Sequence, residues 1–143
     1  MFGYTESSTR VIYFARQEAI QLGAEQVEAH HILLALMRES KKIVLTFLPP
    51  GTSKETLRRQ IGIHAEQARI LPAGTSLPLH KESKRILEYA SEEAEFLEDR
   101  FIGPGHLLLG VLREENSVAA KILHGHGVTL TIVRDKMKTE RTI

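Results

Sequence analysis

Apolar residues recur at three- and four-residue steps along most of the chain, which is the spacing of helices that bury one face. The first such run places Val11, Ala15, Ala19 and Leu22 on one side. The segment HHILLALMRE, from His30, is apolar nearly all round, which predicts a helix buried between others. No run alternates apolar and polar residues with the β-branched content of a strand. The pattern therefore predicts an all-α fold.

The chain contains two similar segments at a constant offset. EAHHILLALMRES begins at Glu28 and GPGHLLLGVLREE at Gly103, so His106 follows His31 by 75 positions. The same offset, without a gap, pairs Arg10 with Arg85, Glu18 with Glu93, Leu33 with Leu108 and Leu48 with Leu123. Agreement at so constant an offset indicates an internal duplication. We therefore expect eight helices, arranged as two four-helix repeats that are related by a pseudo-two-fold axis and share one core.

Helix-boundary residues and a proline-rich segment divide the chain. Thr5 is expected to cap the first helix, and Thr52 with Glu55 forms a T-x-x-E capping box before a later one. Pro104 suits the first position of the helix that holds His106. The segment ILPAGTSLP carries two prolines and a glycine, which are typical of a linker. The predicted organisation is a single domain over residues 1–143, with a first repeat at about 3–69, a linker at about 70–78 and a second repeat at about 79–139.

Composition narrows the class of protein. The 143 residues are 42% hydrophobic and 26% charged, with a net charge of +1, as in a soluble globular domain. Proteins that grip phosphate backbones usually carry a strong basic excess, so no nucleic-acid partner is expected. The absence of cysteine excludes disulfides, thiol catalysis and thiolate metal sites. No segment approaches the ~20 apolar residues of a membrane span or has the pattern of a secretory signal. We therefore expect a cytoplasmic protein without a membrane partner.

Seven histidines raise the question of a metal site or an acid–base site. His124 and His126 form an H-x-H at the predicted end of a helix, but no carboxylate or third histidine lies at ligand spacing. His30 and His31 are adjacent, so on a helix their side chains point about 100° apart and cannot easily face one metal ion. We therefore expect no metal ligands and no cofactor. A small histidine-based metal-binding protein or hydrolase stays the alternative interpretation, with these four histidines as its candidate residues.

The duplicated polar residues are expected to serve the fold. His31 and His106 each occupy the first turn of a short buried helix, where we expect the ring to bond to a neighbouring helix or loop. Glu18 and Glu93 are expected to form ion pairs between helices. Catalysis would need a nucleophile or a second acid nearby, and the repeat supplies none in both copies. No catalytic residue is therefore assigned.

The doubled motif and its surroundings resemble a known family. HILLALMRE and HLLLGVLRE, with the opening MFGYTESSTRVIYFARQEAIQLG and the late segment SVAAKILHGHGV, are similar to the double Clp repeat at the N-terminus of the Clp protein unfoldases, most of all in the ClpC-type branch. The resemblance implies an all-α domain of eight helices. It also implies a non-enzymatic module that docks adaptor proteins and unfolded or tagged substrates for a Clp ATPase ring. The family's ATPase modules are not in this sequence, so we expect either an excised N-domain or a stand-alone protein.

In the ClpC-type branch, this domain also binds arginine-phosphorylated proteins, through one small pocket per repeat. The resemblance places the threonine of each pocket at Thr5 and His80, and the glutamate at His30 and Gly105, so only Thr5 keeps the expected residue. Imidazole accepts guanidinium N–H groups poorly and glycine has no side-chain acceptor, which argues against phosphoarginine recognition in its usual form. We expect Thr5 to face His30 in a first pocket that retains an affinity for anions, and His80 to lie with Gly105 in a second.

Overall fold

The computed structural model describes residues 3–64 and 77–141, and these residues form helices and turns without a strand. The helices are α1 (Glu6–Gln21), α2 (Ala29–Glu39), α3 (Lys41–Leu45), α4 (Lys54–His64), α5 (Lys81–Phe96), α6 (Pro104–Arg113), α7 (Val118–Gly125) and α8 (Leu130–Arg141). The prediction of an all-α fold with eight helices is confirmed. Residues 70–76 of the predicted linker lie outside the described residues, and the repeat boundaries stay a prediction.

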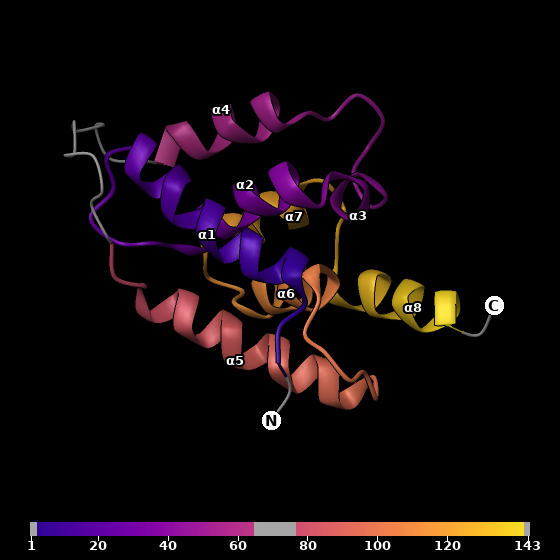
Figure 1. The fold of residues 1–143 in the computed structure, drawn as a ribbon. Coiled ribbons are helices and arrows are strands. Elements are labelled where there is room, and N and C mark those ends of the chain that lie inside the picture. The colour runs from indigo at the N-terminus through magenta and orange to yellow at the C-terminus, as the bar shows by residue number, and fades with distance from the viewer. Residues whose placement is uncertain (1–2, 65–76, 142–143) are drawn as a thin grey trace.

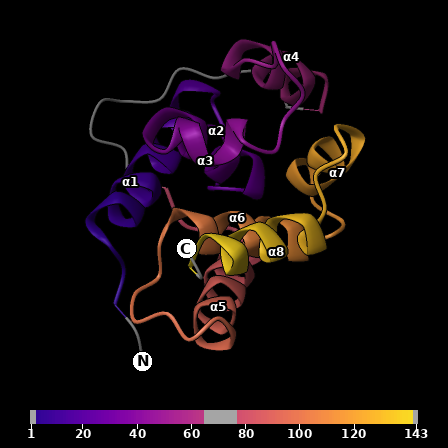
Figure 2. The same ribbon diagram turned by 90° about the vertical axis from the view of Figure 1, so that its right-hand side faces the viewer.

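The helices occur in two sets that begin at matching positions. α5 begins and ends 75 positions after α1, and α6 begins 75 positions after α2. In each set the first two helices pack against one another as a hairpin, and α2 of one set also packs on α6 of the other. Figures 1 and 2 show α2 and α6 in the middle of the molecule, with α4 above them and α5 below. The two repeats therefore share one core, as the duplication predicts.

The middle of the molecule is formed by the two helices that are apolar nearly all round. Residues 29–37 of α2 and 105–112 of α6 are buried, because neighbouring helices cover every face of these short segments. A Cβ at Gly110 would stand 2.5 Å from the carbonyl oxygen of Ile86, so the close packing of α5 on α6 requires glycine there. Among the described residues, no helix combines the length and the apolar character needed to cross a bilayer.

The capping residues at the helix starts are largely those that the sequence predicts. Thr5 Oγ1 accepts the N–H of Ser8 at 3.1 Å, and Pro104 is the first residue of α6, as predicted. The capping box expected at Thr52 and Glu55 is wrong by one position. Ser53 Oγ accepts the N–H of Thr56 at 3.2 Å instead, because α4 begins only at Lys54.

Candidate functional site

The two repeats exchange the segments that precede their first helices. The N–H of Thr5, before α1, donates to the carbonyl of Ile102, before α6, at 3.0 Å. The N–H of His80, before α5, donates to the carbonyl of Val27, before α2, at 2.9 Å. These two bonds are equivalent under the offset of 75, and each lies beside one isolated parallel bridge. The start of α1 is therefore placed against α6, and the start of α5 against α2.

This exchange overturns the predicted pairing of Thr5 with His30. Thr5 precedes α1, and Ser40 follows the last residue of α2. Ser7 Oγ lies 3.3 Å from Ser40 Oγ, so Thr5 lies at the end of the α1–α2 hairpin where α2 ends. His30 lies in the first turn of α2, at the opposite end of that hairpin. Sequence reasoning treated each repeat as self-contained, and the hydrogen bonds between the repeats decide otherwise.

His30 and His80 line one cavity, of about 290 Å³, between the α1–α2 turn and the start of α7. Glu25, Glu28 and His31 also line it, so three imidazoles and two carboxylates face the same space. The N–H of Ala29 donates to a carboxylate oxygen of Glu82 at 2.9 Å, which holds the start of α5 against the start of α2. The first cavity thus belongs to both repeats. The predicted pairing of His80 with Gly105 is wrong for the same reason as that of Thr5 with His30.

Gly105 lines a second cavity, of about 410 Å³, bordered by α3, α6 and α8. Its lining is more apolar and includes Ile43, Phe47 and Met137. A Cβ at Gly105 would stand 2.7 Å from Cε of Met137, so the methionine occupies the space into which a side chain at this position would extend. The two cavities therefore have different chemistry, although they lie at equivalent ends of α2 and α6.

His31 and His106 both bond within the first turn of their own helix, and His106 also bonds to the preceding loop, as expected for that ring. Nδ1 of His31 accepts the N–H of Glu28, and Nδ1 of His106 accepts the N–H of Gly103, both at 2.8 Å. Each ring thereby satisfies one of the N–H groups that a helix start leaves without a partner. Nε2 of His106 also lies 2.5 Å from Oδ2 of Asp99, in the turn before α6. Burial, and secondarily His30, lower the pKa of His31 from 6.5 to about 3.

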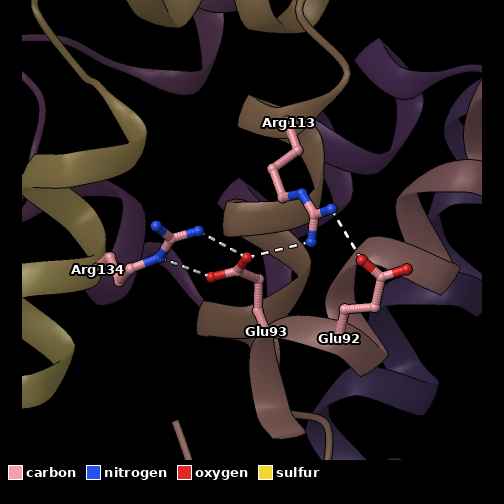
Figure 3. Close-up of polar contacts among 4 residues, drawn as sticks. All are labelled: Glu92, Glu93, Arg113 and Arg134. Carbon is pink, nitrogen blue, oxygen red and sulfur yellow. Dashed lines mark hydrogen bonds and ion pairs between the residues drawn. The ribbon is translucent and has the colours of Figure 1, made fainter. Parts of the chain in front are cut away.

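Glu93 is buried on α5 and joins three helices. Its carboxylate accepts N–H groups of Arg134 on α8 at 2.7 and 2.9 Å and of Arg113 on α6 at 3.2 Å. Figure 3 shows Arg113 and Arg134 reaching Glu93 from opposite sides, while Glu92 pairs with Arg113 at the surface. Burying a carboxylate to 3% exposure is costly unless such partners replace the water that it loses. This carboxylate is therefore committed to holding helices together.

Glu18 is the equivalent of Glu93 in the first repeat. It accepts from Arg58 at 2.7 and 3.0 Å and pairs with Lys54 at 2.9 Å, both on α4. The sequence predicts an ion pair at Glu18, but it does not identify Arg58. Its role was missed because it lies 40 positions from Glu18, at a spacing that no helical period connects.

The rings of His30 and His31 lie closer together than their adjacent positions on a helix predict. The ring centroids of His30 and His31 are 4.2 Å apart, and ligand atoms of Glu28, His30 and His31 all lie within 4.8 Å of one another. The ring of His31 turns back to cap the helix, and this brings it beside His30. Its Nδ1 accepts a hydrogen bond, so the proton of the neutral ring is on Nε2. While the cap holds, the cluster offers a metal two ligand atoms, one fewer than a usual catalytic zinc site.

The H-x-H of the sequence makes no cluster of three ligands among residues 3–64 and 77–141. His126 follows the end of α7 and its Nε2 lies 2.9 Å from Oε1 of Gln60 on α4. This histidine therefore ties α7 to α4, consistent with a position at a helix end.

Comparison with protein families and curated proteins identifies relatives along nearly the whole chain. The model of the Clp repeat (R) N-terminal domain matches residues 3–126. The chain is 31% identical over 139 residues to the negative regulator of genetic competence ClpC/MecB of Bacillus subtilis, and 32% identical over 143 residues to the chaperone protein ClpB of Oceanobacillus iheyensis. Both alignments cover 96% of this chain and 17% of the relative, so the chain spans a small part of the relatives' length.

Solved structures share the fold. The N-terminal domain of ClpD from Arabidopsis thaliana superposes with a TM-score of 0.73 at 22% identity, covering 98% of this chain and 95% of that one. A chain from structural investigations of a malarial protein secretion system gives a TM-score of 0.82 at 17% identity, covering 96% and 93%. At these identities the likeness concerns the fold alone.

Proposed function

This chain belongs to the family of Clp repeat N-terminal domains, and we propose that it is a docking module of a Clp ATP-dependent unfoldase or protease system. In this role it receives adaptor proteins or protein substrates and catalyses no reaction of its own. The ATPase ring that it serves is either a further part of its own chain or a separate protein, because the curated relatives are much longer than this chain.

The observation that carries the proposal is that the duplicated polar residues stabilise the fold. His31 and His106 cap helices through Nδ1, and Glu18 and Glu93 are buried against cationic side chains. A general acid or base must reach the proton of a substrate, and these groups are already engaged inside the protein. The duplicated polar residues are therefore not available for chemistry. The remaining features are two cavities on the surface, which suit recognition of a partner better than catalysis.

The difference between the cavities supports docking of partners through two kinds of group. The first cavity offers imidazoles and carboxylates, and therefore suits a polar or charged group of a partner. The second is bordered by Ile43, Phe47 and Met137, and suits an apolar side chain, whose full burial is worth about 1.5–3 kcal/mol. A partner that uses both cavities would contact both repeats.

Phosphoarginine is a poor fit to either cavity. Position 105, which holds a glutamate in the ClpC-type branch, is glycine here, and Met137 fills the space beside it. In the first cavity, the corresponding position is His30, which a guanidinium group does not bind as it binds a carboxylate. Carboxylate is supplied there only by neighbouring residues such as Glu28. We therefore propose partners other than arginine-phosphorylated proteins.

A competition assay tests the docking proposal. Excess of this chain is added to adaptor-dependent degradation by the full-length Clp protease of the same organism, and it should slow degradation by sequestering the adaptor or substrate. Phe47→Glu alters the second cavity and should weaken the inhibition. Ile63→Glu makes the same kind of change at a side chain that is 80% exposed and should leave the inhibition intact. Degradation that is unaffected by excess chain, with any adaptor of that organism, would contradict docking.

A further inference from the structure

Each of the duplicated histidines accepts an equivalent backbone hydrogen bond at Nδ1. This bond fixes where the proton of the neutral ring lies. Nδ1 of His31 accepts the N–H of Glu28. A ring nitrogen that accepts a hydrogen bond carries no proton, so the proton of the neutral ring is on Nε2. Burial, and then the neighbouring His30, hold the pKa of His31 far below neutral pH, so the ring is uncharged at pH 7. The neutral ring of His31 therefore carries a buried donor, Nε2–H.

In the second repeat, the equivalent nitrogen has a carboxylate partner. Nε2 of His106 lies 2.5 Å from Oδ2 of Asp99. The residue 75 positions before Asp99 is Ala24, whose side chain cannot accept a hydrogen bond. Within the described residues, Nε2 of His31 has no hydrogen-bond partner, although the ring is fully buried. Because buried donors in proteins are nearly always paired, this difference between the repeats needs an explanation.

The turns that carry Ala24 and Asp99 have the same backbone conformation. The N–H of Ala24 donates to the carbonyl of Ala19 at 2.9 Å, and the N–H of Asp99 donates to the carbonyl of Ala94 at 2.8 Å. The residues before them, Gly23 and Glu98, both have positive φ, of 69° and 60°. The side chain of Ala24 is therefore placed toward His31 as that of Asp99 is placed toward His106, and it is shorter by a carboxylate group.

Ala24 and His31 both line the first cavity, of about 290 Å³. We propose that this cavity binds a carboxylate group of a ligand, which displaces the side chains that cover Nε2 of His31 and accepts its hydrogen bond, as Asp99 does from His106. The second repeat thus carries its own carboxylate, and the first repeat takes one from outside. His30 and His80, on the wall of the same cavity, add polar ring atoms around the bound group.

The donor at Nε2 of His31 favours a carboxylate over a metal ion or a phosphate, although Glu28, His80 and Glu82 beside it have the spacing of metal ligands. A protonated Nε2 has no lone pair for a metal, and moving the proton to Nδ1 would break the cap on Glu28. Glu25 and Glu28 also line the cavity, and their charges repel a dianion more strongly than a monoanion. A carboxylate has one charge and planar acceptor geometry, which the contact of Asp99 with His106 already demonstrates in this fold.

Nitrogen-15 NMR of the histidine rings tests the proposal with acetate as the probe. Acetate is titrated against the intact chain at constant ionic strength, with chloride as the balancing anion. The Nε2 and ring-proton signals of His31 should shift and saturate at millimolar acetate, while those of His106 should stay constant because Asp99 holds that nitrogen. Signals of His31 that respond to acetate and to chloride alike, or to neither, would overturn the proposal.

Two reciprocal substitutions provide the matched controls. Ala24→Asp supplies the missing carboxylate from within, so His31 should acquire signals like those of His106 and lose its response to acetate. Asp99→Ala removes the carboxylate of the second repeat, so His106 should gain a response to acetate. An A24D variant whose His31 still responds to acetate would refute the proposal, and this outcome can be read whether or not D99A folds.

The use of this site in docking rests on the proposed function, and peptides separate the two ideas. Acetyl-aspartate N-methylamide offers a side-chain carboxylate, and acetyl-trialanine offers a C-terminal one. The peptide whose carboxylate is recognised should shift the signals of His31 at lower concentration than acetate, and its amidated form should not. If acetate binds but no adaptor or substrate does, the docking function fails and the carboxylate site stands. If adaptors bind and His31 never responds to any carboxylate, the site fails and docking stands.

Discussion

The backbone N–H of Thr5 donates to the carbonyl of Ile102 at 3.0 Å, so the first helix of one repeat starts against the second helix of the other. The equivalent bond, from His80 to Val27, makes the same connection in the opposite direction. Together with the packing of α2 on α6, these bonds place each repeat in direct contact with the other. The duplication has therefore produced one domain, with a cavity at each place where the repeats cross.

Neither repeat should fold alone. Separated chains of residues 3–64 and 77–141 would each expose the face of α2 or α6 that the other covers, and would lose the backbone bonds of Thr5 and His80. Circular dichroism and thermal melting of each half should show no cooperative transition, whereas a mixture of the two should recover helix content. A half that melts cooperatively by itself would show that the repeats are independent domains.

Removal of Glu93 should destabilise the domain far more than removal of its neighbour. Glu93→Ala leaves Arg134 and Arg113 without their carboxylate and opens a space in the interior, and should lower the free energy of unfolding by about 2–4 kcal/mol. Glu92→Ala breaks an exposed pair with Arg113 and should cost about 0–1 kcal/mol. Urea denaturation of both variants compares these costs, and equal losses would contradict the role assigned to the buried carboxylate.

His31 should make the domain less stable in mild acid. Its pKa is lowered from 6.5 to about 3 in the folded state, mainly by burial. The unfolded chain therefore binds a proton below pH 6.5 that the folded chain excludes until about pH 3, so this ring reduces stability as the pH falls through that window. The slope approaches about 1.4 kcal/mol per pH unit for one proton.

A glutamine at position 31 isolates that contribution. His31→Gln can still accept the N–H of Glu28 from the third position of the helix, and it cannot take up a proton. The free energy of unfolding, measured by denaturation between about pH 6 and pH 4, should fall less steeply with decreasing pH for the variant than for the unaltered chain. The difference in slope should correspond to about one proton. Parallel curves would show that His31 does not titrate differently in the two states.

Phosphoarginine should bind this chain weakly, and a carboxylate at position 105 should improve binding. In calorimetric titration, the unaltered chain should bind free phosphoarginine little better than inorganic phosphate. Gly105→Glu combined with Met137→Ala supplies a carboxylate and the room for it, and should increase the affinity. Gly62→Glu, at a glycine with open space around its Cα, is the matched control and should change nothing. Micromolar binding at both cavities of the unaltered chain would contradict this account.

The helices and their duplication could be read from the sequence because the stripe that a helix buries is a local pattern. The spacing of Val11, Ala15 and Ala19 and the offset between His31 and His106 were sufficient for the fold. The caps at Thr5 and Pro104 were also predictable, because capping bonds span only three or four residues.

The site was predicted less well, because it depends on contacts between the repeats. The pattern of one sequence does not indicate whether Thr5 lies near His30 or near Gly103. Hydrogen bonds between segments that are distant in the sequence determine its position. Arg58 and Arg134 were missed as partners of the buried glutamates for the same reason. The contrast between Ala24 and Asp99 did leave a signal, since aligning the repeats at the offset of 75 shows it directly.

The most direct test of the docking function is equilibrium binding between this chain and the Clp adaptors of its own organism. Fluorescence anisotropy of each labelled adaptor, and of a labelled unfolded substrate, is followed as the chain is added. The account predicts saturable binding of at least one of them, weakened by Phe47→Glu and unchanged by Ile63→Glu. Absence of measurable affinity for every adaptor and substrate, by a chain that melts cooperatively, would contradict it.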